Sequence, residues 1–98
     1  MGKKLAIAIS VGHAGKYSVQ QYPRGKHSNT YIKIKLGATI VGKYVYTDGT
    51  WESGSTLSSS HRQFFEDGCK KFRTILDSNA AKLNTGQKPS NINWGMPP

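Results

Sequence analysis

Residues 31–36 read Tyr-Ile-Lys-Ile-Lys-Leu, so aliphatic side chains alternate with basic or aromatic ones. Successive side chains of a β-strand point to opposite faces of the sheet. The three aliphatic residues are therefore predicted to face the core, and Tyr31, Lys33 and Lys35 to face the other way. The pattern indicates a half-buried strand with a basic outer face.

A second strand is predicted to follow over residues 39–47, and the Asp-Gly pair at 48–49 is the strongest short hairpin signal. With a two-residue loop, Tyr46 would face Trp51 across the hairpin. Tyr44 would then share one face with them, because it lies two residues before Tyr46. The returning strand is expected to end near residue 57.

Two further strands are predicted before this hairpin. Residues 5–9 alternate large and small apolar side chains, and residues 17–22 form a short run ended by a proline. Residues 23–29 are polar and basic, and are expected to form a loop that carries Arg24 and Lys26.

One helix is predicted after the strands. The serines at 58–60 are typical of a helix start, and Ser60 has the spacing of a capping box with Gln63. Apolar side chains then recur every three or four residues, which predicts a stripe facing the core: Phe65, Cys69, Phe72 and Leu76. The helix is expected to end near residues 78–79 or to continue to Leu83.

The order of elements predicts an α+β fold, with an antiparallel sheet of about four to five strands and one C-terminal helix packed on it. A chain of 98 residues fits one domain, placed here at residues 1–84. Residues 85–98 are rich in proline and asparagine and are expected to form an irregular tail. Trp94 is unusual in such a tail, and would pack on the domain or on a second subunit.

The charge is unevenly distributed along the chain. The formal net charge is +9, and residues 1–47 carry eight Lys or Arg side chains and no Asp or Glu. Residues 48–98 carry six basic and five acidic side chains. A basic half of this kind repels itself unless an anion neutralises it, and nucleic acid is the commonest polyanion. A merely solvated basic surface is the alternative.

The sequence favours a protein that is not an enzyme. Asp48 is explained by its turn and the three acids of the helix by pairing along it, so no pair of carboxylates stands out for acid–base work. Cys69 lies on the apolar stripe, where a packing role is favoured over a catalytic one. No metal site or cofactor is predicted, because one cysteine and three dispersed histidines lack ligand spacing.

The lone cysteine and the absence of a long apolar run indicate a cytoplasmic protein with no membrane association.

Basic and aromatic side chains are interleaved on the predicted strands. Single-stranded nucleic acid is bound by a positive surface for phosphates together with aromatic faces for bases. The residues predicted to bind it are Arg24, Lys26, Lys33, Lys35 and Lys43 for phosphates, and Tyr31, Tyr44 and Trp51 for bases. Two alternatives remain open. The aromatic residues of the hairpin would equally suit a core face beneath the helix, and the lysines an ordinary solvated sheet face.

Residues 31–76 resemble, in layout, the single-stranded-DNA-binding domain of the positive cofactor four family of transcriptional coactivators. The shared layout is a basic alternating strand (31–36), a strand ending in aromatics (40–46), an acidic-glycine turn (47–49), Trp-Glu-Ser-Gly (51–54) and a serine-capped helix with an aromatic near its start (55–64).

The resemblance implies a homodimer formed through the helices, with curved sheets that bind unpaired strands. Five residues fall in the strands that correspond to that surface: Lys33, Lys35, Lys43, Tyr44 and Trp51.

The function expected from the sequence is therefore non-enzymatic binding of single-stranded DNA or RNA by a basic, aromatic-bearing sheet surface. The alternative is a small phage-type inhibitor or adaptor that docks on an acidic surface, or on a nucleic-acid site, of a partner protein.

Overall fold

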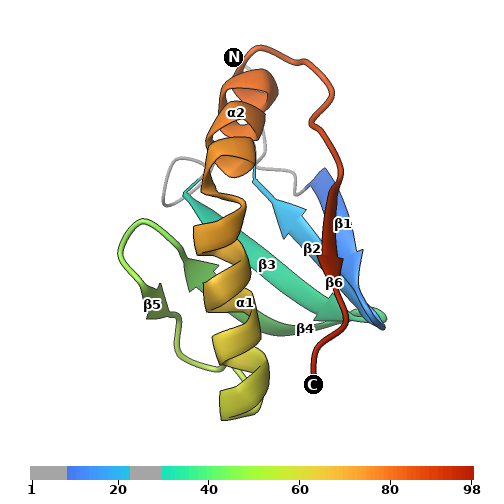
Figure 1. Cartoon of the computed structure of the whole chain (residues 1–98), viewed down its shortest axis with the longest axis vertical. Coiled ribbons are helices and arrows are strands. Elements are labelled where there is room, and N and C mark those ends of the chain that lie inside the picture. The colour runs from blue at the N-terminus through green and yellow to red at the C-terminus, as the bar shows by residue number, and fades with distance from the viewer. Residues whose placement is uncertain (1–8, 23–29) are drawn as a thin grey trace, which may run out of the picture.

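The computed structural model describes residues 9–22 and 30–98. The strand predicted at 5–9, apart from its last residue, and the predicted loop with Arg24 and Lys26 lie outside the described residues. The chain is an α+β structure of one mixed sheet and two helices (Figure 1). In chain order its elements are β1 (Ile9–Ala14), β2 (Tyr17–Gln21), β3 (Tyr31–Leu36), β4 (Thr39–Val45), β5 (Thr50–Trp51), α1 (Ser59–Lys71), α2 (Arg73–Asn84) and β6 (Ile92–Gly95).

The sheet has the strand order β5-β4-β3-β2-β1-β6. Strands β1 to β5 each pair antiparallel with the next strand along the chain. Strand β6 returns from the far end of α2 and pairs with β1 in parallel. The prediction of four to five antiparallel strands and an irregular tail is therefore wrong in two details: a sixth strand exists, and the tail contributes it.

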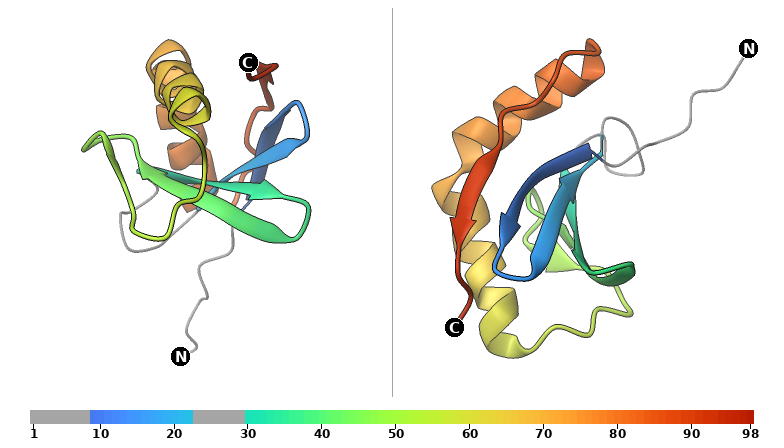
Figure 2. Two further views of the ribbon diagram at one scale, coloured as in Figure 1. Left: turned by 90° about the horizontal axis from the view of Figure 1, so that it is seen from below. Right: turned by 90° about the vertical axis from the view of Figure 1, so that its right-hand side faces the viewer.

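Both helices lie on one side of the sheet, and the sheet curves around them (Figure 2). The two helices replace the single one predicted, because the chain leaves helical geometry at Phe72, with φ −104° and ψ 21°. The N-cap is Ser58 rather than Ser60, and its hydroxyl accepts a hydrogen bond from the His61 N–H at 3.3 Å. None of the helices in the described part of the chain is long and apolar enough to cross a membrane.

The main core lies between the sheet and the helices. Its fully buried side chains include Val11 and Val19 of the sheet and Phe65 and Leu76 of the helices. The predicted helix stripe is confirmed at Phe65, Cys69 and Leu76, while Phe72 is half-buried and packs against the same core.

Trp94 belongs to this core and is 5% exposed. Of the two predicted positions, on the domain or on a second subunit, it takes the first. Its indole N–H points to the Val11 carbonyl at 3.4 Å, which ties β6 to β1. The ring also contacts Phe72, with ring centroids 5.5 Å apart. The C-terminal segment is thus part of the folded layer.

Candidate nucleic-acid interface

The strand Tyr31–Leu36 divides its side chains between the two faces of the sheet. Ile32 and Ile34 are fully buried beneath the helices, as the alternation predicts. Lys33 and Lys35 are half-exposed and lie on the side turned away from the helices. Leu36 points to the helix side by its parity, yet 44% of it is exposed, so the helices do not cover this end of the strand.

Strand β4 adds a third lysine to the same side. Lys33 and Lys43 are direct cross-strand partners, so two positive charges stand opposite each other. Lys35 is opposite Ser18 of β2, and Lys33 is also opposite Gln20, so no acid neighbours them on that strand. We call the side of the sheet turned away from the helices, with Lys33, Lys35 and Lys43, the lysine face.

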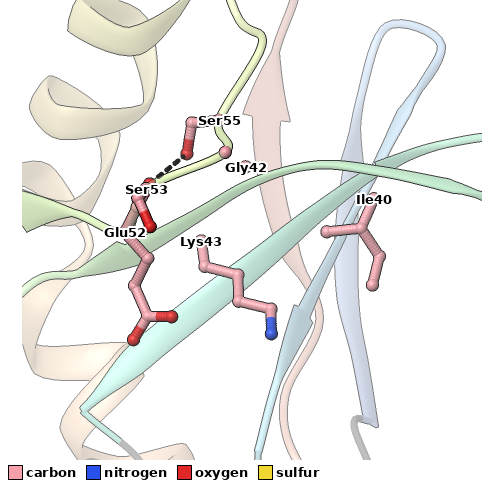
Figure 3. A pocket seen from close by; sticks show the side chains of 7 residues that line it. Ile40, Gly42, Lys43, Glu52, Ser53 and Ser55 are labelled. Atoms are coloured by element: carbon pink, nitrogen blue, oxygen red, sulfur yellow. Dashed lines mark hydrogen bonds between the residues drawn. The ribbon is translucent and has the colours of Figure 1, made fainter.

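The like-charge pair on the lysine face has an electrostatic cost. Like charges directly opposite on two strands destabilise the sheet by roughly 0.2–1 kcal/mol. Lys33 gains one compensating contact, because its ammonium lies 4.9 Å from the centroid of the Tyr22 ring. Glu52, which follows β5, brings a carboxylate to the same side: its N–H donates to the Lys43 carbonyl at 2.9 Å, and its side chain and that of Lys43 line one hollow (Figure 3). An anion bound on this face would offset the repulsion between the lysines.

Tyr31 lies on the lysine face but not as an open ring. It stacks on Tyr22 with ring centroids 4.7 Å apart and an interplanar angle of 14°, and together with Val45 the two rings form a small second core. Tyr31 is only 5% exposed. Burial, followed by the neighbouring Tyr22 hydroxyl, raises the pKa of Tyr31 to about 12. Its ring is already stacked within the protein, whereas base stacking needs an open aromatic face.

Tyr44 and Trp51 lie on the opposite side, beneath α1. They are cross-strand partners with ring centroids 4.8 Å apart. The indole N–H of Trp51 donates to a carboxylate oxygen of Glu66 on α1 at 2.8 Å. Of the two roles left open by the sequence, the structure places these aromatics in the packing between sheet and helix.

The hairpin register differs from the prediction. Tyr44, not Tyr46, is opposite Trp51, because the turn spans residues 46–49 rather than two residues. The N–H groups of Asp48 and Gly49 both donate to the Val45 carbonyl, and Gly49 adopts a positive φ of 76°. A left-handed residue followed by the returning strand is typical of longer hairpin loops.

A β-bulge in β4 brings an apolar side chain onto the lysine face. Ile34 pairs with Gly42 but Lys35 pairs with Ile40, so Val41 is the extra residue. Residues 40 and 43 would face opposite sides of a regular strand, and the bulge turns them to the same side. Figure 3 shows the side chains of Ile40 and Lys43 projecting together from β4. The sequence alternation gives no signal of this bulge.

A shallow hollow of about 90 Å³ lies beside these two side chains. It is bounded by β4 on one side and by the segment after β5 on the other (Figure 3). Ser55 donates a hydrogen bond to the Glu52 carbonyl at 3.0 Å, which holds that segment in a tight turn. The residues lining the hollow are Ile40, Gly42, Lys43 and the segment 52–55.

A second hollow, of about 440 Å³, lies on the helix side between the β4–β5 turn and α1. Two of the charged side chains that line it, Arg73 and Glu66, have protein partners. Arg73 donates to Asp77 at 3.1 Å and lies 5.2 Å from the Tyr46 ring centroid, and Glu66 accepts from Trp51. Burial also raises the pKa of the Cys69 thiol beside it to about 12, which keeps the sulfur protonated and unreactive.

Among residues 9–22 and 30–98, no group of three or more His, Cys, Asp or Glu side chains could hold a metal ion. Comparisons with protein-family models, with curated proteins and with solved structures found no match. The resemblance to the positive cofactor four family therefore stays a prediction from sequence layout.

Proposed function

We propose that this protein binds single-stranded nucleic acid through the phosphates, on the lysine face of its sheet. The observation that carries the proposal is the cross-strand pair Lys33–Lys43, with Lys35 on the same face. Three cations on one side, with the carboxylate of Glu52 beside Lys43, leave a net positive face in the described part of the sheet, and a polyanionic ligand would neutralise it. Arg24 and Lys26, which lie outside the described residues, remain proposed phosphate contacts.

The proposal differs from the sequence expectation in how the bases are bound. Tyr31 is stacked on Tyr22, and Tyr44 and Trp51 pack beneath α1. Phosphate contacts are therefore given the main share of the affinity. Binding of this kind depends weakly on sequence and strongly on salt, because each neutralised phosphate releases counterions.

The test is a fluorescence-anisotropy titration with single- and double-stranded oligonucleotides at several salt concentrations. Lys33, Lys35 and Lys43 are replaced together by glutamine. The matched control replaces Lys70, Lys71 and Lys88 by glutamine, which removes the same charge. All three are exposed: the first two lie on α1 and the third lies between α2 and β6.

For three phosphate contacts, the slope of log K against log salt should become shallower by about 2 for a single strand. The affinity at 0.1 M salt should fall by about a hundredfold. The control triple variant should lose far less. Absent binding, binding indifferent to salt, or equal losses in the two variants would each contradict the proposal.

The same experiment separates the proposal from docking on an acidic protein. Poly-glutamate is the probe, since it offers carboxylates without bases or phosphates. If it binds the lysine face as tightly as an oligonucleotide of equal charge, the adaptor alternative is favoured instead.

A further inference from the structure

The turn between β3 and β4 differs from the lysine face beside it, because it carries no charge. Residues 36–40 read Leu-Gly-Ala-Thr-Ile and are all exposed and uncharged. We call them the hairpin tip. Gly37 adopts a positive φ of 64°, and a Cβ placed on it would meet nothing within 4 Å, so the turn projects into open space.

The hairpin tip carries an apolar side chain on each of its faces. Leu36 and Ile40 are both 44% exposed. Ile40 is turned to the lysine face by the bulge at Val41, and Leu36 keeps the parity of the buried Ile34 on the opposite face. Exposed Leu and Ile side chains are among those that proteins insert between bases.

Cations surround the hairpin tip. Ile40 is the cross-strand partner of Lys35, and Lys43 projects beside it from the same strand (Figure 3). Lys16 is exposed in the β1–β2 turn, which lies at the same end of the sheet because Tyr17 pairs with Leu36. Basic residues next to an exposed apolar tip are complementary to a ligand with anionic and apolar parts side by side.

We infer that the hairpin tip is the base-contacting element of the proposed nucleic-acid site. Leu36 and Ile40 would pack against unpaired bases while Lys33, Lys35 and Lys43 hold the flanking phosphates. This inference rests on the proposed function and supplies the base contact that the buried aromatics do not make. A membrane surface has similar chemistry, but two half-exposed aliphatic side chains bury too little apolar area to hold a protein there.

The test compares an oligothymidylate with an abasic oligonucleotide of equal length and equal charge. The variant is Leu36→Ser combined with Ile40→Ser. The control is Ile75→Ser, which changes an aliphatic residue of α2 that is 37% exposed. Since all three side chains are exposed, the folded state should survive, and thermal unfolding checks this. The conservative variant Ile40→Met should keep wild-type binding.

The wild type should bind the oligothymidylate about tenfold more tightly than the abasic strand. The double variant should lose this preference while its affinity for the abasic strand and its salt slope stay unchanged. Equal wild-type affinity for the two strands, or equal losses for both strands in the double variant, would overturn the inference and leave the lysine face standing. If neither strand binds the wild type, the proposed function itself fails. Loss of binding to phosphatidylglycerol vesicles in the double variant, with oligonucleotide binding intact, would overturn the inference in favour of a membrane.

Discussion

The six-membered ring of Trp94 lies directly against Gly68 of α1: a Cβ on Gly68 would sit 2.8 Å from two of its carbons. Gly12 of β1 bounds the five-membered ring of the same indole from the sheet side, where a Cβ on Gly12 would be 2.8 Å from Cδ1 of Trp94. Two glycines thus form the slot that holds the C-terminal strand in the fold.

Gly68→Ala should destabilise the protein even though alanine is the better helix former. The gain in helix propensity is about 0.5–1 kcal/mol, but overpacking against a buried, rigid ring costs about 1–3 kcal/mol. In a Trp94→Ala background the clash is absent, so the same Gly68→Ala change should become stabilising. Urea unfolding of the four proteins measures this reversal of sign, and a Gly68→Ala effect that is the same in both backgrounds would contradict the contact.

Trp94→Ala alone should reduce the free energy of unfolding by about 3–5 kcal/mol, as expected for a large aromatic removed from a core. The matched control is Met96→Ala, because Met96 lies two residues later and is 77% exposed. Its effect should be within about 0.5 kcal/mol, as for other surface substitutions. Equal effects of the two changes would mean that β6 is not docked on β1.

The segment between α2 and β6 is fixed by Asn79, which is fully buried. Its amide donates to the Ser90 carbonyl at 2.9 Å and accepts from the Ser90 N–H at 2.7 Å. Asn79→Asp keeps the acceptor and removes the donor, so it should cost more than about 1–3 kcal/mol by leaving a carboxylate facing a carbonyl. Urea unfolding is the measurement, with the exposed neighbour Ser78→Ala as control. An Asn79→Asp protein as stable as the control would refute the role.

The free energy of unfolding should fall at alkaline pH, because a buried thiol and a buried phenol stay protonated in the folded state. Burial raises the pKa of Cys69 from 9.0 to about 12, and burial with the nearby Asp77 raises that of Tyr46 from 10.0 to about 12. The unfolded chain ionises first, so the stabilisation is complete below pH 9 and is lost as pH rises toward 12.

Each such group contributes up to about 1.4 kcal/mol per pH unit within that window. Urea unfolding at a series of pH values above neutrality measures the slope. Cys69→Ala should remove the part of the decline that begins near pH 9. A free energy of unfolding that is flat between pH 8 and 11 would show that these groups do not titrate differently in the two states.

The alternation of residues 31–36 was sufficient to predict which side of the sheet each lysine occupies. A strand with period two has no other way to bury Ile32 and Ile34 together. The helix stripe around Phe65 was predictable for the same reason, since only one helical spacing gathers those side chains.

The role of the aromatics could not be decided from the sequence, because Tyr44 and Trp51 are equally compatible with a core and with a binding surface. The choice depends on Glu66, which accepts the indole N–H from a helix formed later in the chain. The bulge at Val41 and the parallel strand β6 were not predicted, because both depend on pairing with another strand. The alternation of residues within one segment does not reveal such pairing.

The cross-strand pair Lys33–Lys43 leads to opposite effects of one substitution on stability and on binding. In a Glu52→Gln background, which removes the carboxylate beside Lys43, Lys43→Gln removes the repulsion from Lys33 alone, so it should raise the free energy of unfolding by about 0.2–1 kcal/mol at low salt. The gain should shrink at high salt, where exposed charges are screened.

The same change should weaken oligonucleotide binding and make its salt slope shallower by about 0.7. Lys70→Gln removes the same charge from α1, away from the lysine face, and should change neither the free energy of unfolding nor oligonucleotide binding. Urea unfolding and anisotropy on the same protein samples measure both effects. If Lys43→Gln lowers the free energy of unfolding, the two lysines do not repel each other. If the Lys43→Gln protein binds as the wild type does, Lys43 does not contact a phosphate.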